Sequence, residues 1–259
     1  MASLINNHLL SIFAVIVGAA LGSFLNVCIY RIAAGKSIVF PSSFCPNCGH
    51  PIRLYDNIPV ISYLILRGRC RDCSEKISLR YPVVELITAL LALLLFREYG
   101  LSLQFLSAFL FTCALIIIAF IDIEHRIIPD VITLPGIVLF FVLAVFLMDV
   151  PFLDSIFGIL IGGGCLYLIA VVYQLIRKRD GMGGGDIKLL AMIGAFWGWK
   201  SLLFVLLVSS LLGAIVGVSV MIYKGKDMKY AVPFGPFLST AAVAYIFFGE
   251  NATRFLYYY

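Results

Sequence analysis

Long apolar stretches recur along this sequence and limit what it can fold into. A helix needs about 20 mostly apolar residues to cross the hydrocarbon core of a bilayer. Stretches of this kind lie at roughly 9–30, 83–96, 104–121, 131–148, 155–176, 187–199, 201–223 and 232–249. The sequence predicts an all-α polytopic membrane protein with about eight transmembrane helices, or seven if 187–223 is divided differently.

The composition excludes several other classes of protein. Apolar residues make up 62% of the 259 residues and charged residues 13%, with a mean hydropathy of +1.06. A soluble domain carries about 25% charged residues, so a soluble globule, a disordered chain and a nucleic-acid binder are all excluded. The odd number of cysteines, seven, does not fit a secreted disulfide framework.

The basic residues predict the orientation, because Lys and Arg collect in cytoplasmic loops. With residues 31–82 placed inside and the spans alternating, 16 of the 19 basic residues face the cytoplasm, and only Arg97, Lys200 and Arg254 lie outside. The opposite orientation leaves three inside. We therefore expect both termini outside, and we expect the first apolar segment to be retained because no Lys or Arg precedes it.

The polar loop from about 33 to 82 carries two CxxC pairs, Cys45-Pro-Asn-Cys48 and Cys70-Arg-Asp-Cys73. Their spacing is typical of two knuckles that close one tetrahedral zinc site, and Gly49 suits the tight turn after the first pair. Two disulfides are the alternative, which a cytoplasmic location disfavours. A zinc site closed by four cysteines has no open coordination position, so its role is structural. The other cysteines, Cys28, Cys113 and Cys165, are expected to be small buried hydrophobes.

The same loop is rich in arginine, at Arg53, Arg67, Arg69 and Arg71. Two interpretations stay open for these side chains: contact with anionic lipid headgroups together with a role in topology, or contact with a substrate.

Acidic residues at the edges of spans are costly and suggest function. Asp122 closes the third span, Asp186 opens the sixth, and Glu85 lies just inside the second. Asp122 and Asp186 fall on the same cytoplasmic edge, so they can meet and share a proton as in an aspartic protease. Alone, Asp122 would be a polar helix end and Asp186 an N-cap.

Neighbouring residues refine this hypothesis. Gly183, Gly184 and Gly185 leave the backbone free to adopt positive φ and to approach an extended peptide. Asp186 begins a helix and Asp122 ends one, so the macrodipole favours Asp186 as base and Asp122 as acid. Asp130, after Pro129, is expected to cap a helix. We interpret Glu124, His125 and Arg126 as interfacial loop residues.

Taken together, these features resemble the bacterial type IV prepilin peptidases, and the resemblance covers most of the chain. Its motifs are Gly22-Ser-Phe-Leu-Asn-Val-Cys-Ile-Tyr-Arg31, the two CxxC pairs, Asp56-Asn-Ile-Pro-Val-Ile-Ser-Tyr63, Arg67-Gly-Arg-Cys70, Asp122 with Pro129-Asp130, and Gly183-Gly-Gly-Asp186, which fits the GxGD signature of intramembrane aspartyl proteases. It suggests three parts: 1–32 as a first helix, 33–82 as a zinc loop and 83–259 as a peptidase core.

The resemblance implies a bacterial inner-membrane enzyme that removes the basic leader from prepilins and pseudopilins at the cytoplasmic face. It implies that the new N-terminal amine is then methylated with S-adenosylmethionine, an activity associated with the cysteine loop. Asp122 and Asp186 would be the catalytic pair, and Cys45, Cys48, Cys70 and Cys73 the ligands of Zn²⁺. Both termini would be periplasmic, and the partners would be prepilins and lipids, with no nucleic acid.

The methyl-donor site has no recognisable motif, since no GxGxxG follows a strand. Ser23, Asn26 and Glu85 are polar residues near the cytoplasmic face and are our candidates for methyl transfer. The alternatives are a peptidase without methyltransferase activity, an ion-coupled transporter and a scaffold for pilus assembly.

Overall fold

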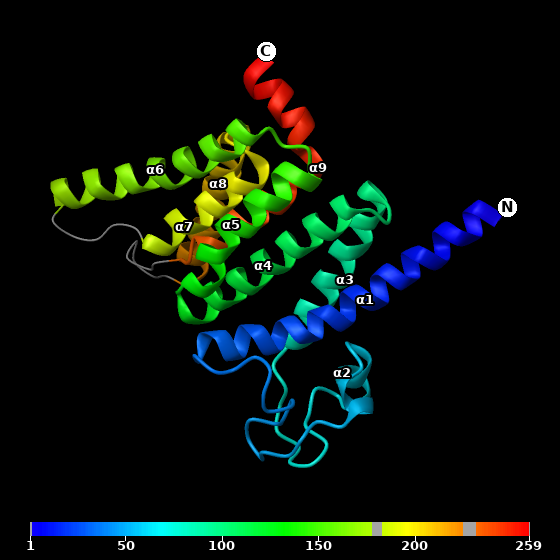
Figure 1. The fold of residues 1–259 in the computed structure, drawn as a ribbon. Coiled ribbons are helices and arrows are strands. Elements are labelled where there is room, and N and C mark those ends of the chain that lie inside the picture. The colour runs from blue at the N-terminus through cyan, green and yellow to red at the C-terminus, as the bar shows by residue number, and fades with distance from the viewer. Residues whose placement is uncertain (1, 178–182, 225–231, 259) are drawn as a thin grey trace. The chain divides into compact units, whose positions relative to one another are not determined.

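The structure, a computed structural model, describes residues 2–177, 183–224 and 232–258. Helices dominate these residues, which confirms the predicted all-α class. The long helices are α1 (Ala2–Ala33), α3 (Arg80–Tyr99), α4 (Leu103–His125), α5 (Asp130–Leu147), α6 (Phe152–Arg177), α7 (Gly184–Trp197), α8 (Lys200–Lys224) and α9 (Gly235–Tyr258). Two short helices, η1 (Leu54–Asn57) and α2 (Ile61–Ile65), lie in the cysteine loop (Figure 1).

Each predicted span coincides with one long helix. Within α1, α4, α5, α6 and α8, five segments are long and apolar enough to cross a membrane: His8–Ala33, Leu103–His125, Asp130–Leu147, Phe152–Ile176 and Lys200–Tyr223. α9 contains a shorter apolar part, Gly235–Gly249. The chain is therefore a multi-pass membrane protein, while the number of eight spans stays a prediction.

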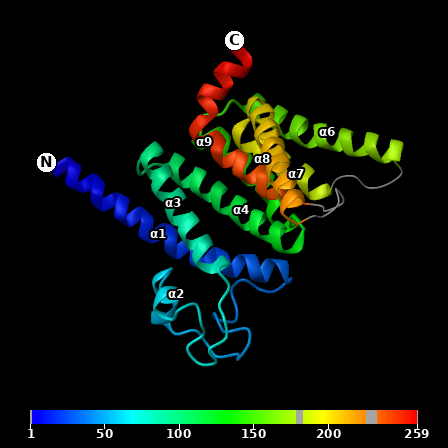
Figure 2. The ribbon, with the colours of Figure 1, turned by 180° about the vertical axis from the view of Figure 1, so that it is seen from behind.

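Helix contacts divide the chain into two compact units, residues 1–117 and 118–259, and the division falls within α4. In the first unit α1 packs along α3. In the second unit α7 packs against both α5 and α6, and α8 packs against α9 (Figures 1 and 2). The separate division at residues 32 and 82, drawn from the sequence, stays a prediction.

The α1–α3 pair is closed by glycines that let the two backbones approach. A Cβ on Gly22 would come within 2.7 Å of Glu85 Cα, and one on Gly18 within 2.9 Å of Ala89 Cα. These two glycines are four residues apart and share one face of α1. Small residues at this spacing are a common way for helices to associate in membranes, where lipid removes the hydrophobic drive for association.

The α6–α7 pair uses the same device in the second unit. Gly158 of α6 and Gly194 of α7 lie backbone against backbone, so that a Cβ on either would overlap the carbonyl of the other. One turn further along α6, a Cβ on Gly162 would come within 2.7 Å of the Leu190 carbonyl oxygen. The Ser155 hydroxyl donates a hydrogen bond to the Ala195 carbonyl across the same crossing. The crossing fixes α7, and so the start of α7, against α6.

Two expectations from the sequence are corrected here. α5 begins at Asp130, as expected, but its N-cap is Pro129 and Asp130 makes no capping hydrogen bond. The Asp130 carboxylate instead accepts hydrogen bonds from Lys188 Nζ of α7, with 2.7 Å to each oxygen. Cys165, expected to be buried, is exposed on α6, whereas Cys28 is buried as expected and Cys113 is half-buried. An exposed position on an apolar helix suits contact with lipid.

The backbone contact at Gly194 leads to a stability prediction. A methyl group at this position would force α6 and α7 apart, and overpacking of this kind costs about 1–3 kcal/mol. Gly194→Ala should therefore lower the midpoint of thermal unfolding in detergent. Gly164→Ala on α6 is the matched control, because a Cβ there meets nothing within 4 Å. Equal midpoints for the two variants would contradict the packing argument.

Candidate active site and metal centre

The four cysteines of the CxxC pairs form one cluster in the structure. Their Sγ atoms all lie within 4.8 Å of one another, and the Cys45 and Cys73 Sγ atoms are 3.9 Å apart. All four thiols are free, so the disulfide alternative is not what the structure shows. Four thiolates at about 2.3 Å from one zinc ion lie about 3.8 Å from each other in a tetrahedron. The cluster therefore has the size and the donor set for a metal ion of this kind.

Both knuckles are built in the same way. The Cys45 N–H bonds to the His50 carbonyl (2.9 Å), and the Gly49 N–H returns to the Cys45 carbonyl (2.9 Å). In the second knuckle the Cys70 N–H bonds to the Glu75 carbonyl (2.8 Å), and the Ser74 N–H to the Cys70 carbonyl (3.0 Å). Gly49 and Ser74 both have positive φ, +74° and +60°. The predicted turn at Gly49 is confirmed, and its counterpart uses serine.

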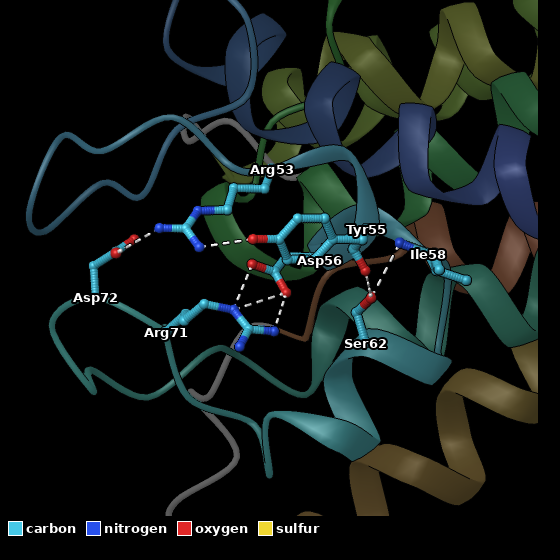
Figure 3. A network of polar contacts seen from close by, with 7 residues as sticks. All are labelled: Arg53, Tyr55, Asp56, Ile58, Ser62, Arg71 and Asp72. Atoms are coloured by element: carbon cyan, nitrogen blue, oxygen red, sulfur yellow. Dashed lines mark hydrogen bonds and ion pairs between the residues drawn. The ribbon is translucent and has the colours of Figure 1, made fainter.

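Side chains outside the knuckles tie the cysteine loop together (Figure 3). Arg71, between Cys70 and Cys73, donates hydrogen bonds to both carboxylate oxygens of Asp56, with distances from 2.5 to 3.1 Å. Arg53 binds the Tyr55 hydroxyl (2.7 Å) and lies 3.8 Å from Asp72. Both guanidinium groups also lie over the Tyr55 ring. Hydrogen bonds from Arg71 lower the pKa of Asp56, so the pair is ionised at neutral pH.

This network gives two of the four arginines of the loop a structural role. Arg53 and Arg71 make internal contacts, and their guanidinium groups join the segment after the first knuckle to the second knuckle. Arg67 and Arg69 are exposed, and both interpretations, lipid and substrate, stay open for them.

Arg31, at the end of α1, organises the first part of the loop. It is 6% exposed, and its guanidinium donates to the carbonyls of Ser37, Ile38, Pro41 and Ser42. The chain that follows α1 therefore curves around the buried guanidinium, so that four of its carbonyl groups accept hydrogen bonds from it. The sequence did not single out this residue for such a role.

The three candidates for methyl transfer lie together where α1 meets α3. Glu85 is 7% exposed and accepts a hydrogen bond from the Val60 N–H (2.7 Å), and the Ser23 hydroxyl also interacts with it. Asn26 is 1% exposed and donates to the Tyr81 carbonyl (3.0 Å) and to the Gly22 carbonyl (3.3 Å). Its Oδ1 atom is buried and has no hydrogen-bond partner among the described residues.

The two aspartates of the predicted pair both belong to the second unit. Asp122 lies in the last turn of α4 and is 5% exposed, and Asp186 lies in the first turn of α7. Gly185, next to Asp186, and Gly235, next to Asp122 Oδ2, both lie against Ile128, so the two carboxyl groups lie in the same neighbourhood. Asp186 Oδ1 is buried and, within the described part of the chain, accepts no hydrogen bond. Two positions that are 64 residues apart in the sequence are thus brought to one place.

Two residues beside this pair, Gly235 and Ile128, escaped the sequence reasoning. The Gly235 N–H at the start of α9 donates to Asp122 Oδ2 (2.9 Å). A Cβ on Gly235 would come within 2.7 Å of that oxygen and 3.1 Å of Ile128 Cδ1, and a Cβ on Gly185 within 2.7 Å of Ile128 Cβ. A backbone N–H donor cannot be recognised from its side chain. The position of Gly235 between Pro233 and Pro236 is the one sequence feature that could have indicated its role.

The glycines before Asp186 adopt conformations that differ from the expected positive φ. Gly183 is the N-cap of α7 with extended backbone (φ −69°, ψ 135°), and Gly184 and Gly185 are the first helical residues. The need for glycine at position 185 comes from the contact with Ile128. Gly183 and Gly184 are exposed, and the extended Gly183 still offers a backbone edge to a peptide.

Comparison with known proteins identifies the family. Residues 16–99 match the Bacterial Peptidase A24 N-terminal domain, and residues 109–218 match the Type IV leader peptidase family. The prepilin leader peptidase/N-methyltransferase of Pseudomonas putida is 38% identical over 260 residues, which is 92% of this chain and 90% of the relative. The chain belongs to the type IV leader peptidase family.

Other relatives carry the same name. The protein of Pseudomonas aeruginosa is 36% identical over 263 residues, covering 93% of this chain and 91% of its own length. The protein of Neisseria gonorrhoeae is 36% identical over 265 residues, covering 92% of this chain and 90% of its own length. No solved structure matches the chain. The cysteine cluster lies within the first family match and the two aspartates lie within the second, while Gly235 lies outside both.

The geometry of the cysteine cluster predicts a bound metal. Purified wild-type protein should contain about one zinc ion per chain, and Cys70→Ser should lose it because three thiolates remain. The measurement is elemental mass spectrometry after a chelator wash. Cys165→Ser is the control, since that exposed thiol lies on α6 and outside the cluster. Zinc retained by Cys70→Ser, or none in the wild type, would contradict the assignment.

Proposed function

We propose that this protein cleaves the basic leader from type IV prepilins and pseudopilins with Asp122 and Asp186, and then methylates the new N-terminal amine. The observation that carries the proposal is the placement of two carboxyl groups at the ends of α4 and α7, with Asp122 buried and Asp186 half-buried, in a chain of the type IV leader peptidase family. The names of the relatives support both activities.

In the proposed reaction one carboxylate takes a proton from water while the other carboxyl group protonates the carbonyl oxygen of the scissile peptide. The water oxygen bonds to the carbonyl carbon. The C–N bond then breaks, and the amine leaves with the proton that the base had taken. The carboxyl group that acted as acid recovers its proton from the collapsing intermediate, so the pair ends as it began.

The contacts around the pair favour Asp122 as the base, which reverses the hypothesis drawn from helix ends. The Gly235 N–H stabilises negative charge on Asp122 Oδ2, whereas the buried Asp186 Oδ1 has no donor within the described residues and gains from carrying the shared proton. The two groups titrate as a unit, so the assignment concerns where the proton sits in the resting pair.

Exposed glycines suit the binding of an extended substrate next to this pair. Gly183 is extended and lies three residues before Asp186, where the backbone can pair with a peptide in the manner of an added strand. We propose Gly183, Gly184 and Gly185 as supporting residues, with Gly185 acting through its packing on Ile128.

The proposed location follows from the substrate. A basic leader stays in the cytoplasm while the apolar stretch of the prepilin lies in the bilayer, so the scissile bond lies at the cytoplasmic edge of the inner membrane. We propose that the aspartate pair and the zinc loop face the cytoplasm and that both termini face the periplasm, in line with the distribution of basic residues.

For methylation we propose that Ser23, Asn26 and Glu85 contribute to the methyl-donor site. The unpartnered Asn26 Oδ1 and the Glu85 carboxylate are acceptors, which fits a cationic ligand with donor groups. S-adenosylmethionine, when bound, supplies a methyl group on a positively charged sulfur. Glu85 also holds the backbone at Val60. Cys45, Cys48, Cys70 and Cys73 would hold a zinc ion, which would fix the shape of the rest of the loop.

The aspartate pair gives the first functional prediction. Asp122→Asn and Asp186→Asn should each slow leader cleavage about 10²–10⁴-fold, because general acid–base catalysis contributes this much. The measurement is the mass spectrum of a prepilin incubated with detergent-purified enzyme. Asp154→Asn is the matched control, since Asp154 lies in α6 and pairs with Trp199 and Lys200. Substantial cleavage by Asp122→Asn would exclude the pair.

The proposed methyl transfer gives the second functional prediction. Glu85→Gln and Cys45→Ser should cleave the prepilin but leave the product largely unmethylated, because both changes alter the first unit and spare the aspartates. Glu98→Gln, an exposed position on the same helix α3, should methylate normally. The readout is one added methyl group on the cleaved product when S-adenosylmethionine is present. Cleavage without methylation by the wild type would leave a peptidase only.

A further inference from the structure

The cysteine loop exposes a cluster of large apolar side chains on its two short helices. Leu54 of η1 is 92% exposed and Ile58, just after it, 45%; in α2, Ile61 is 54% exposed, Leu64 68% and Ile65 70%. We call these five side chains the interfacial patch. Neighbouring exposed apolar groups of this kind mark an interaction site, and none of them is used by the metal cluster or by the aspartate pair.

A hydrogen bond attaches the segment that carries the patch to α3. The Val60 N–H, directly before α2, donates to Glu85 Oε2 at 2.7 Å. Glu85 is five residues after the start of α3 at Arg80, which is about 7.5 Å along the helix axis. Val60 has φ +62°, a costly conformation for a β-branched residue, which persists only where surrounding contacts hold it.

The outward surface of α3 around Glu85 is apolar. On α3, Val83 is 41% exposed, Leu86 54% and Leu90 55%, so this helix presents apolar side chains outward from its first turn onward. α3 packs along α1, which contains the span candidate His8–Ala33. A segment attached to the second turn of α3 therefore lies beside a helix that is long and apolar enough to cross a membrane.

Charge next to the patch fits a membrane surface. Arg67 and Arg69 follow α2 directly and are exposed, and in the described part of the chain neither makes an ion pair, unlike Arg71 with Asp56. Long basic side chains can keep their charge among headgroups while their stems cover apolar surface.

We propose that the interfacial patch is an anchor to anionic phospholipid: its apolar side chains enter the cytoplasmic leaflet, and Arg67 and Arg69 bind the phosphate groups. Short amphipathic segments of this composition bind in the interface plane. The anchor would hold the metal-binding loop against the membrane instead of leaving it free in the cytoplasm, and it does not depend on either proposed activity.

The test uses full-length protein in nanodiscs of phosphatidylcholine and phosphatidylglycerol. A photoreactive phenylalanine analogue replaces Leu64, and in a matched control it replaces Glu75, an exposed position on the second knuckle. After illumination, intact-protein mass spectrometry should show several-fold more addition of one phospholipid at position 64 than at position 75. Zinc content reports that both variants are folded.

A second comparison tests the charged part of the proposal. Arg67→Gln with Arg69→Gln, in the position-64 background, should reduce the share of phosphatidylglycerol among the attached lipids and leave attachment in pure phosphatidylcholine unchanged. Equal lipid addition at positions 64 and 75 would overturn the anchor. Attachment to an added prepilin in place of lipid would also overturn it and would assign the patch to the substrate.

Discussion

Close approach of helix backbones at glycines is the constraint on which the rest of this structure depends. In lipid, apolar side chains gain nothing by leaving one apolar surrounding for another, so helices associate through tight van der Waals contact and hydrogen bonds. Each compact unit contains one such contact: Gly18 and Gly22 of α1 on α3 in the first, Gly158 and Gly162 of α6 on α7 in the second. Ser23, Asn26 and Glu85 in the first unit and Asp186 in the second lie on helices that these contacts fix.

The consequence is clearest where polar groups follow the glycines along the helix. In α1, Ser23 directly follows Gly22 and Asn26 lies one turn further on. The contact of Gly22 with the Glu85 backbone brings these two polar side chains to Glu85. In the second unit the α6 contact fixes α7, and the Lys188–Asp130 pair connects the second turn of α7 to the first turn of α5. Asp186 thus lies at the start of a helix, α7, that is fixed by contacts with both α6 and α5.

The sequence predicted the parts of the sites that consist of side chains at a fixed local spacing. The four cysteines needed only two turns of similar geometry, whereas the common membrane edge of the two aspartates stays a prediction. The sequence reasoning missed contacts made by backbone or by distant partners. The Gly235 N–H lies 113 residues from Asp122 in the sequence. The four carbonyl groups around Arg31 cannot be recognised from the sequence. Asp130 was interpreted as a helix cap because its partner Lys188 lies 58 residues away. Backbone N–H and carbonyl groups are the same at nearly every residue, so the sequence alone does not show which of them contact a charged side chain.

The proposed division of roles in the aspartate pair depends on which of two electrostatic effects is larger. A helix terminus favours or disfavours a charge by about 0.3–1 kcal/mol, and on this basis Asp186 in the first turn of α7 is the better anion. A hydrogen bond to a charged group contributes about 1.5–3 kcal/mol, and a buried polar atom without a partner loses about 1–3 kcal/mol. The Gly235 N–H on Asp122 and the absence of a donor for Asp186 Oδ1 among the described residues both act in the opposite sense to the helix ends. The direct contacts are the larger effect, so we propose that the pair rests with its proton on Asp186 and that the Gly235 N–H at the start of α9 prepares Asp122 to accept a proton from water.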